Sequence, residues 1–335
     1  MKTRSLTEGA LLGALTVLLT ILGEYLGIPA VIVPVPLILL VYRQGFRWGV
    51  ITSLVAALVT GLAAGHVLAG LSIIIWGFVG VALGIALKEK LSFPKLMVIG
   101  IFANLVVIGL NALLYTLIIG GSQFLDMMNT LTQSIEQAMD TARSLGAAEE
   151  ALVNYQVMLQ LVPFIFRNAL PAMLFLSSLA MAFIHLAVAR LVLKRMGDSV
   201  PWVKPFTQWR LPGYCAIFLI FGWITTQLAI LLELPPWLEF VGVNLFYISS
   251  SAYLVTAISL AWYYFNQRRT PTFLRVLFVL LLFWVPFVLM AMMLLTIVDG
   301  FVDLRRLMAS KAEVVKEEDV HGAEDPEGDD SDSDE

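Results

Sequence analysis

The stretch VLAGLSIIIWGFVGVALGIAL (residues 67–87) runs for 21 residues without a charged side chain. A helix of about 20 apolar residues crosses the roughly 30 Å hydrocarbon core of a bilayer, so this stretch predicts a transmembrane helix. The whole chain agrees: of its 335 residues, 59% are hydrophobic and 14% are charged, with a mean hydropathy of +0.86. Soluble domains are about 25% charged, which excludes a single soluble domain. One cysteine, Cys215, excludes a disulfide scaffold.

Nine apolar stretches predict an all-α fold, a polytopic transmembrane bundle of eight or nine spans. They are 6–27, 30–42, 47–65, 67–87, 96–120, 161–193, 212–232, 238–265 and 273–298. The stretch 30–42 is short and contains two prolines. A full crossing, a tilted or partly unwound helix and a re-entrant segment are therefore all open for it.

A polar insert, residues 122–160, interrupts the apolar pattern. Its apolar residues recur at steps of three and four, at Phe124, Met128, Leu131, Ile135, Met139, Ala142 and Leu145. This spacing predicts an amphipathic helix that ends at Gly146, followed by a second helix from Ala147 into the next span. We interpret the insert as an extracytoplasmic amphipathic hairpin on the membrane surface or over a cavity. The alternative is a long solvated loop with some helix.

Basic loop residues indicate the orientation, because Lys and Arg concentrate on the cytoplasmic side. Their distribution predicts a multi-pass protein of the cytoplasmic (plasma) membrane with a cytoplasmic N-terminus. The last span is the exception, since a crossing at 273–298 places Arg305 and Arg306 outside. Either all nine stretches cross, or one C-terminal segment does not.

Three regions follow from the pattern. Residues 1–193 form a six-helix membrane unit that includes the insert, residues 194–306 add further membrane helices, and residues 307–335 form a disordered acidic tail. Within the tail, residues 311–335 carry two lysines and twelve Asp or Glu, whereas all other residues carry 19 Lys and Arg against 13 Asp and Glu. Such a biased, charged segment does not bury enough apolar surface to fold.

No zincin, P-loop or nucleophile-elbow motif occurs in the chain. We therefore expect no enzyme, no catalytic residue, no metal or other cofactor, and no nucleic-acid partner.

Ionisable and polar residues within spans are costly and mark candidate sites. The candidate ligand-binding residues are Glu24, His66, Trp76, Asn111, Tyr115 and Arg167. Glu24, His66 and Arg167 are predicted near the outer ends of the spans, with Arg167 one to two turns inside the sixth. An intramembrane enzyme would need these three within hydrogen-bond reach. The alternative is that all six are interfacial, helix-bridging or packing residues. His185 is interpreted as interfacial.

The first helix carries two pairs of small residues, Gly9 with Gly13 and Ala10 with Ala14, each four positions apart. Such pairs let another helix approach closely, so they form a candidate helix-docking face. With T-E-G-A-L-L-G-A-L-T (7–16), I-P-A-V-I-V-P-V-P (28–36) and R-Q-G-F-R-W-G (43–49), they resemble the opening of the substrate-binding S components of energy-coupling-factor transporters. The resemblance implies a small-molecule ligand, docking of the first helix on a coupling membrane subunit, and separate ATPases.

The whole chain is also similar to the YybS-like family of bacterial integral membrane proteins, a family without an assigned function. The N-terminal pattern and the ending I-V-D-G-F-V-D-L-R-R (297–306) carry this similarity. Two functions follow as hypotheses. The first is a small-solute binding or transport component resembling S components. The second is a non-transporting membrane scaffold or regulatory partner of an envelope or signalling protein.

Overall fold

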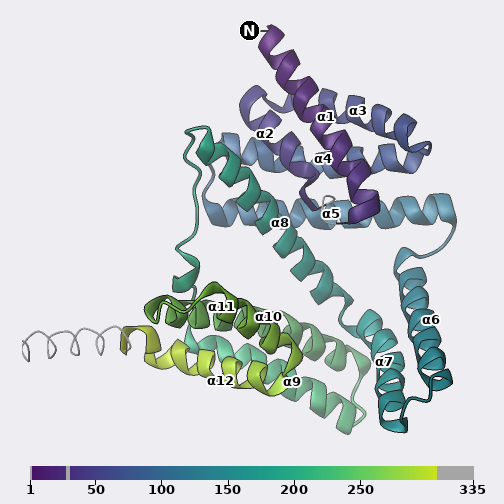
Figure 1. The fold of residues 1–335 in the computed structure, drawn as a ribbon, viewed down its shortest axis with the longest axis vertical. Helices are drawn as coiled ribbons and strands as arrows, with labels where there is room; N and C mark the ends of the chain where they lie inside the picture. Colours follow the sequence, from purple (N-terminus) through teal and green to yellow (C-terminus); the bar gives the residue numbers. More distant parts are fainter. Residues whose placement is uncertain (1, 28–30, 308–335) are drawn as a thin grey trace, which may run out of the picture. The chain divides into compact units, whose positions relative to one another are not determined.

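The computed structural model describes residues 2–27 and 31–307, apart from the side chains of residues 2–5, 24, 25, 283 and 286. The chain divides into two compact units between Val203 and Lys204, and each unit is described by itself (Figure 1). The predicted acidic tail lies beyond residue 307, outside the described residues. The predicted division of the chain at residues 193 and 306 stays a prediction.

The first unit contains eight helices in its described residues. They are α1 (Lys2–Leu26), α2 (Pro34–Gln44), α3 (Phe46–Ala64), α4 (Val67–Lys88), α5 (Phe93–Ile119), α6 (Gln123–Ser144), α7 (Glu149–Asn168) and α8 (Leu170–Arg195). Helix α4 lies at the centre and packs against α2, α3 and α5, while α8 packs on α5 and α2. The core between them contains Ile38, Leu83, Leu96 and Leu186, each at most 1% exposed.

The second unit is built on a pair of helices and a bent helical arm. Its elements are the short helices η2 (Phe206–Gln208) and η3 (Gly213–Cys215), followed by α9 (Ala216–Leu231), α10 (Pro236–Gln267), α11 (Thr272–Trp284) and α12 (Pro286–Val302). Helices α9 and α10 cross closely at Gly222 and Gly242. A Cβ atom on Gly222 would lie 2.7 Å from the backbone nitrogen of Phe246, so only glycine permits this approach.

The predicted all-α polytopic fold is confirmed. Among the described residues, seven helices are long and apolar enough to cross a membrane: α1, α3, α4, α5, α8, α9 with the preceding η3, and α10. Helices α11 and α12 pass the same test only together, with an angle of 101° between them, and bring the number to eight if they form one span.

The predicted stretch 30–42 is not a full-length span. Its helix, α2, has 11 residues, or about 16 Å at 1.5 Å per residue. Pro34 and Pro36 stand at its start, where a missing N–H costs no helical bond. Arg43 near its end forms an ion pair of 2.9 Å with Glu8 of α1. The end of this buried short helix therefore lies beside the start of α1.

The predicted sixth span, 161–193, is also different, because the helix breaks at Ala169. Helix α7 ends at Asn168, and only α8 from Leu170 onward qualifies as a span. Pro171 accounts for the break, since a proline ring clashes with the carbonyl four residues earlier, here that of Arg167. Arg167 consequently lies in the last turn of α7 and not inside the span, which corrects the prediction.

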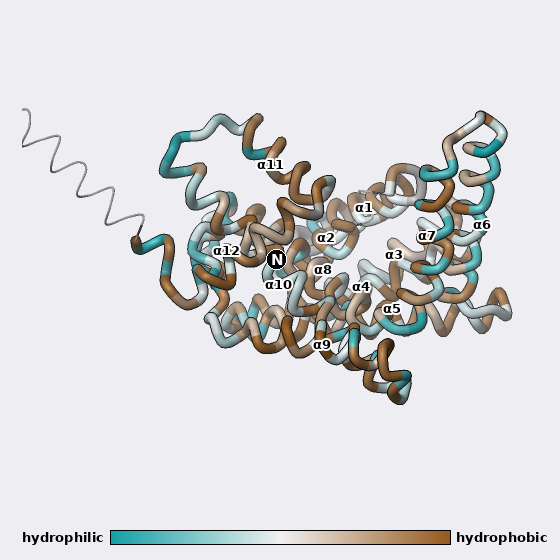
Figure 2. Tube along the Cα trace, turned by 90° about the horizontal axis from the view of Figure 1, so that it is seen from below, coloured by the Kyte–Doolittle hydropathy of each residue, from teal (hydrophilic) through white to brown (hydrophobic). Residues whose placement is uncertain are grey.

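The helical hairpin predicted for the insert is confirmed. Helix α6 ends before Gly146, whose φ of +79° lies in the left-handed region that favours glycine. Helix α7 then packs back on α6. Figure 2 shows hydrophilic and hydrophobic residues alternating along α6 and α7. The position of this hairpin relative to the membrane stays a prediction.

Candidate functional site

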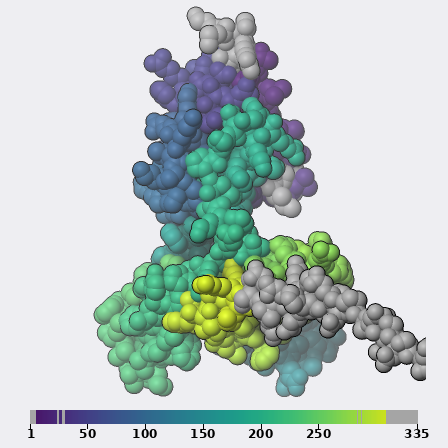
Figure 3. Space-filling model, turned by 90° about the vertical axis from the view of Figure 1, so that its left-hand side faces the viewer, coloured from purple at the N-terminus to yellow at the C-terminus, as the bar shows by residue number. Residues whose placement is uncertain are grey.

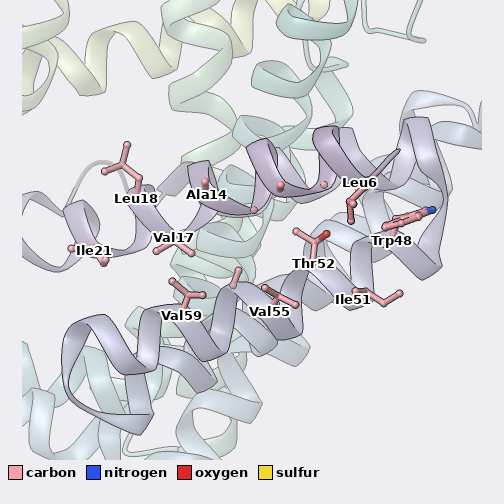
Figure 4. Close-up of a pocket in the computed structure, with 14 residues that line it drawn as sticks. Leu6, Ala14, Val17, Leu18, Ile21, Trp48, Ile51, Thr52, Val55 and Val59 are labelled. Atoms are coloured by element: carbon pink, nitrogen blue, oxygen red, sulfur yellow. The ribbon is translucent and has the colours of Figure 1, made fainter. Parts of the chain in front are cut away.

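A groove of about 500 Å³ runs between α1 and α3 and contains all four residues of the predicted docking face. The close-up in Figure 4 shows Leu6 and Trp48 at one end and Ile21 and Val59 toward the other. Its lining is almost entirely apolar. Because both helices are candidate membrane spans, the groove suits hydrocarbon or another apolar helix and does not suit a polar solute.

The two pairs of small residues have different surroundings. Gly9 and Gly13 are buried against α3, and a Cβ atom on Gly13 would lie 2.9 Å from Cγ2 of Thr52. Ala10 and Ala14 are exposed. The glycines thus allow α1 to approach α3 within the unit. The alanines remain available to a helix from outside.

Two candidate ligand residues belong to α4. His66 caps its start by accepting a hydrogen bond at Nδ1 from the backbone N–H of Ala69, at 3.2 Å. It also lines a shallow apolar groove of about 410 Å³ between the ends of α3 and α4. Trp76 is half-buried and packs against the main core of the first unit. His66 therefore has a capping role and Trp76 a packing role within the first unit.

The other candidates lie at or near the far end of α5 and at the end of α7. Tyr115 donates a hydrogen bond of 3.0 Å to Asp126 of α6, which ties the insert to α5. Asn111 donates to the carbonyl of Val107 on its own helix, at 2.9 Å. Arg167 is exposed. The side chain of Glu24 lies outside the described residues, so its distance to Arg167 stays open.

His185 is not interfacial as predicted, since its side chain is fully buried. Its Nε2 lies 2.9 Å from the carbonyl oxygen of Val31, just before α2. A carbonyl oxygen can only accept a hydrogen bond. We therefore assign Nε2 as the donor, which makes His185 the link between α8 and the segment that leads into α2.

A buried ion pair in the second unit was not among the predicted site residues. Asp299 is 0% exposed, and its Oδ2 lies 3.3 Å from Nε of Arg305. Arg305 also donates to the carbonyls of Thr207 and Trp209 and to the hydroxyl of Ser259. The available signal was the ending I-V-D-G-F-V-D-L-R-R (297–306), which places one aspartate within a long apolar stretch.

A second ion pair lies beside the first. Arg210 contacts Asp303 at 2.8 Å and donates to the carbonyl of Gly300. The backbone at Gly300 approaches Gly213 so closely that a Cβ atom on Gly300 would lie 2.9 Å from the Cα of Gly213. The segment 299–305 is therefore held against residues 207–213 by Arg210 and by the contacts of its own Arg305.

These helices and buried charges define a class, the polytopic helical membrane proteins. Within it, the chain belongs to the family described as "Predicted membrane protein (DUF2232)", which matches residues 10–300. It is similar to "Uncharacterized protein YybS" of Bacillus subtilis (strain 168), with 25% identity over 318 residues that cover 90% of this chain and 97% of that protein. The expected YybS-like family is confirmed. No solved structure matches the chain.

Proposed function

We propose that the protein is the membrane-embedded binding component of a larger complex. A transmembrane helix of a coupling subunit would dock along α1, and a small solute would bind at the end of the first unit where α3, α5 and α7 end. The observation that carries the proposal is the pair of exposed alanines, Ala10 and Ala14, along an apolar groove within two candidate spans.

The docking role rests on how helices associate in lipid. Lipid tails are as apolar as leucine side chains, so close packing at small residues replaces the hydrophobic effect as the driving force. Ala10 and Ala14 let an incoming backbone approach α1, while the exposed Val55 and Val59 of α3 line the opposite wall. The resemblance of α1 to the docking helix of S components supports the same choice of partner.

The solute-binding role rests on the order of the helices. If successive packed helices alternate in direction, the turn at His66, the end of α5 near Tyr115 and the junction at Arg167 would share one end of the unit. The hydrogen bond from Tyr115 to Asp126 connects that end to the α6–α7 hairpin, which would act as a lid. An arginine there suits an anionic group of the solute. We propose binding and not catalysis.

The proposed orientation follows from the basic loops. The N-terminus would lie in the cytoplasm and the α6–α7 hairpin outside the cytoplasmic membrane, where a solute arrives. The ATPases that drive uptake would be separate subunits.

The docking role is tested by purifying the tagged protein from native membranes. Ala10→Leu with Ala14→Leu would fill the outer face of the groove and should remove a co-purifying membrane subunit. Ala63→Leu is the matched control, because Ala63 is an exposed alanine of α3 that does not line the groove. If the double variant retains the same partners as the control, this docking face is wrong.

The solute role is tested separately by native mass spectrometry of the detergent-purified protein. A stoichiometric small molecule that is lost in Arg167→Ala supports the proposal. A protein that carries only lipid in every preparation contradicts it.

The second candidate function is a scaffold or regulatory partner without a solute. The favouring observation is that His66, Trp76 and Asn111 have contacts within their own helix or the core. Under this alternative, deleting residues 122–145 should remove a partner while the wild type binds no small molecule.

A further inference from the structure

Both ends of the bent arm formed by α11 and α12 lie at the C-terminal end of α10. At the start of the arm, Arg275 donates to Oδ1 of Asn266 at 2.7 Å and to the carbonyl of Thr270 at 3.0 Å. At its end, the hydroxyl of Tyr263 donates to the carbonyl of Arg305 at 3.0 Å. Tyr263 and Asn266 are separated by less than one helical turn. The end of the arm therefore lies beside the same end of α10 as its start.

The buried ion pair strengthens this return. Arg305 contacts Ser259 of α10 and the carbonyls of Thr207 and Trp209, while Asp299 in the last turn of α12 supplies the counter-charge. A buried charge is stable only when it is paired and hydrogen-bonded. The contacts consequently fix the end of α12 beside α10. Figure 3 shows the C-terminal part of the described chain in yellow.

The lengths and the bend agree with a returning arm. The 13 residues of α11 and the 17 residues of α12 measure about 20 Å and about 26 Å, so neither helix alone reaches the roughly 30 Å of a hydrocarbon core. Val285 is extended, with φ −118° and ψ 97°, as expected before a proline. The angle of 101° follows at this residue.

The charges divide the arm into a base and a tip. Residues 276–298 contain no charged side chain, and Trp284 and Phe287 beside the bend are 83% and 72% exposed. The base carries Arg275 and Arg305 and lies beside Arg268 and Arg269. An apolar tip with a basic base is the pattern of a segment that enters a bilayer and leaves on the side it came from.

We propose that α11 and α12 form a re-entrant hairpin whose tip lies in the lipid hydrocarbon. The chain after Leu307 would then leave on the side of the α10–α11 loop, which places Arg305 and Arg306 with the other basic residues. The proposal is independent of the docking and solute roles proposed above.

The test uses the single cysteine of the chain. Cys215→Ser gives a cysteine-free background, into which Ser331→Cys, Thr272→Cys or Leu234→Cys is introduced. Ser331 marks the tail, the exposed Thr272 marks the α10–α11 side, and Leu234 marks the α9–α10 turn at the other end of α10. A membrane-impermeant maleimide is applied to intact cells and to inverted membrane vesicles.

We expect Ser331→Cys to label from the same side as Thr272→Cys and from the side opposite to Leu234→Cys. Labelling of Ser331→Cys together with Leu234→Cys would show a complete crossing and overturn the proposal. The tip is tested with Trp284→Cys, which should resist the impermeant reagent from both sides and react with it only after denaturation in detergent, because the thiolate is the nucleophile and a thiol in hydrocarbon stays protonated. Reaction of this variant with the impermeant reagent from either side would overturn the embedding of the tip.

Discussion

Arg43 at the end of α2 lies 2.9 Å from Glu8 near the start of α1, measured from Nη2 to Oε1. Gln44 donates a second hydrogen bond to the same carboxylate at 2.6 Å. The two contacts hold the last residues of a half-length helix at the level of the first turns of a full-length one. They therefore place the end of α2 beside the start of α1, although α2 is too short to span.

The Glu8–Arg43 pair should contribute modestly to stability. Both side chains are partly exposed, at 20% and 30%, and such pairs are worth about 1 kcal/mol or less. Glu8→Gln or Arg43→Gln should lower the midpoint of thermal unfolding slightly, measured in detergent. The charge swap Glu8→Arg with Arg43→Glu should recover part of the loss. If the swap is less stable than both single variants, the pair is not the dominant contact.

Removal of the His185 side chain should also lower stability. His185→Phe keeps an aromatic ring but leaves the carbonyl of Val31 without its donor. Val31 is partly buried, so the cost should lie at or below the lower end of the range of about 1–3 kcal/mol for a buried unsatisfied group. His185→Gln retains a donor and should lose less stability, as measured by thermal unfolding. Equal losses in the two variants would show that ring packing, and not the hydrogen bond, is the important term.

The close crossing of α9 and α10 predicts that replacing Gly222 by alanine lowers stability. Gly222→Ala should destabilise the protein, because its Cβ would meet the backbone nitrogen of Phe246 at 2.7 Å. Gly109→Ala in α5 is the matched control, since nothing lies within 4 Å of its Cβ position. There alanine should be neutral or stabilising by up to about 1 kcal/mol. The midpoint of thermal unfolding should therefore fall in Gly222→Ala. In Gly109→Ala it should rise or stay unchanged.

The Asp299–Arg305 pair should respond asymmetrically to removal of either charge. Arg305→Met leaves the carboxylate of Asp299, which is fully buried, without its cation. The expected cost is about 3–5 kcal/mol. Asp299→Asn should cost less, because Arg305 keeps Thr207, Trp209 and Ser259 as acceptors. Thermal unfolding ranks the two variants.

The control for this ranking is Arg143→Met, which breaks an exposed pair with Asp140. This variant should have no measurable effect. If Asp299→Asn lowers the unfolding midpoint as much as Arg305→Met, the carbonyls of Thr207 and Trp209 do not stabilise the guanidinium of Arg305 in the absence of the Asp299 carboxylate.

Much of the fold was predictable because each membrane span can be recognised from the hydropathy of its own residues. The uncharged stretch 67–87 became α4, and the spacing of apolar residues in 122–160 correctly predicted two helices separated at Gly146. The errors occurred at prolines. The stretch 161–193 is apolar enough to read as one span, but Pro171 ends the helix that contains Arg167.

The candidate site was less predictable, because its residues were chosen from single helices. Gly9, Gly13, Ala10 and Ala14 looked equivalent in the sequence, yet the glycines face Thr52 and the alanines are exposed. Asp299 and Arg305 were missed as a site because their six-position spacing is no recognised motif, and the other partners of the Arg305 side chain stand 46 to 98 positions away.

The sequence by itself determined that the chain is a polytopic helical membrane protein, because long runs of apolar side chains are stable only in lipid or a dry core. Only the tertiary structure decided where the chain turns back, through Glu8 with Arg43 and through Tyr263 with Arg305. The physical reason is that hydropathy measures the preference of each residue for lipid over water. Ion pairs and close backbone contacts depend instead on which distant residues the folded helices bring together.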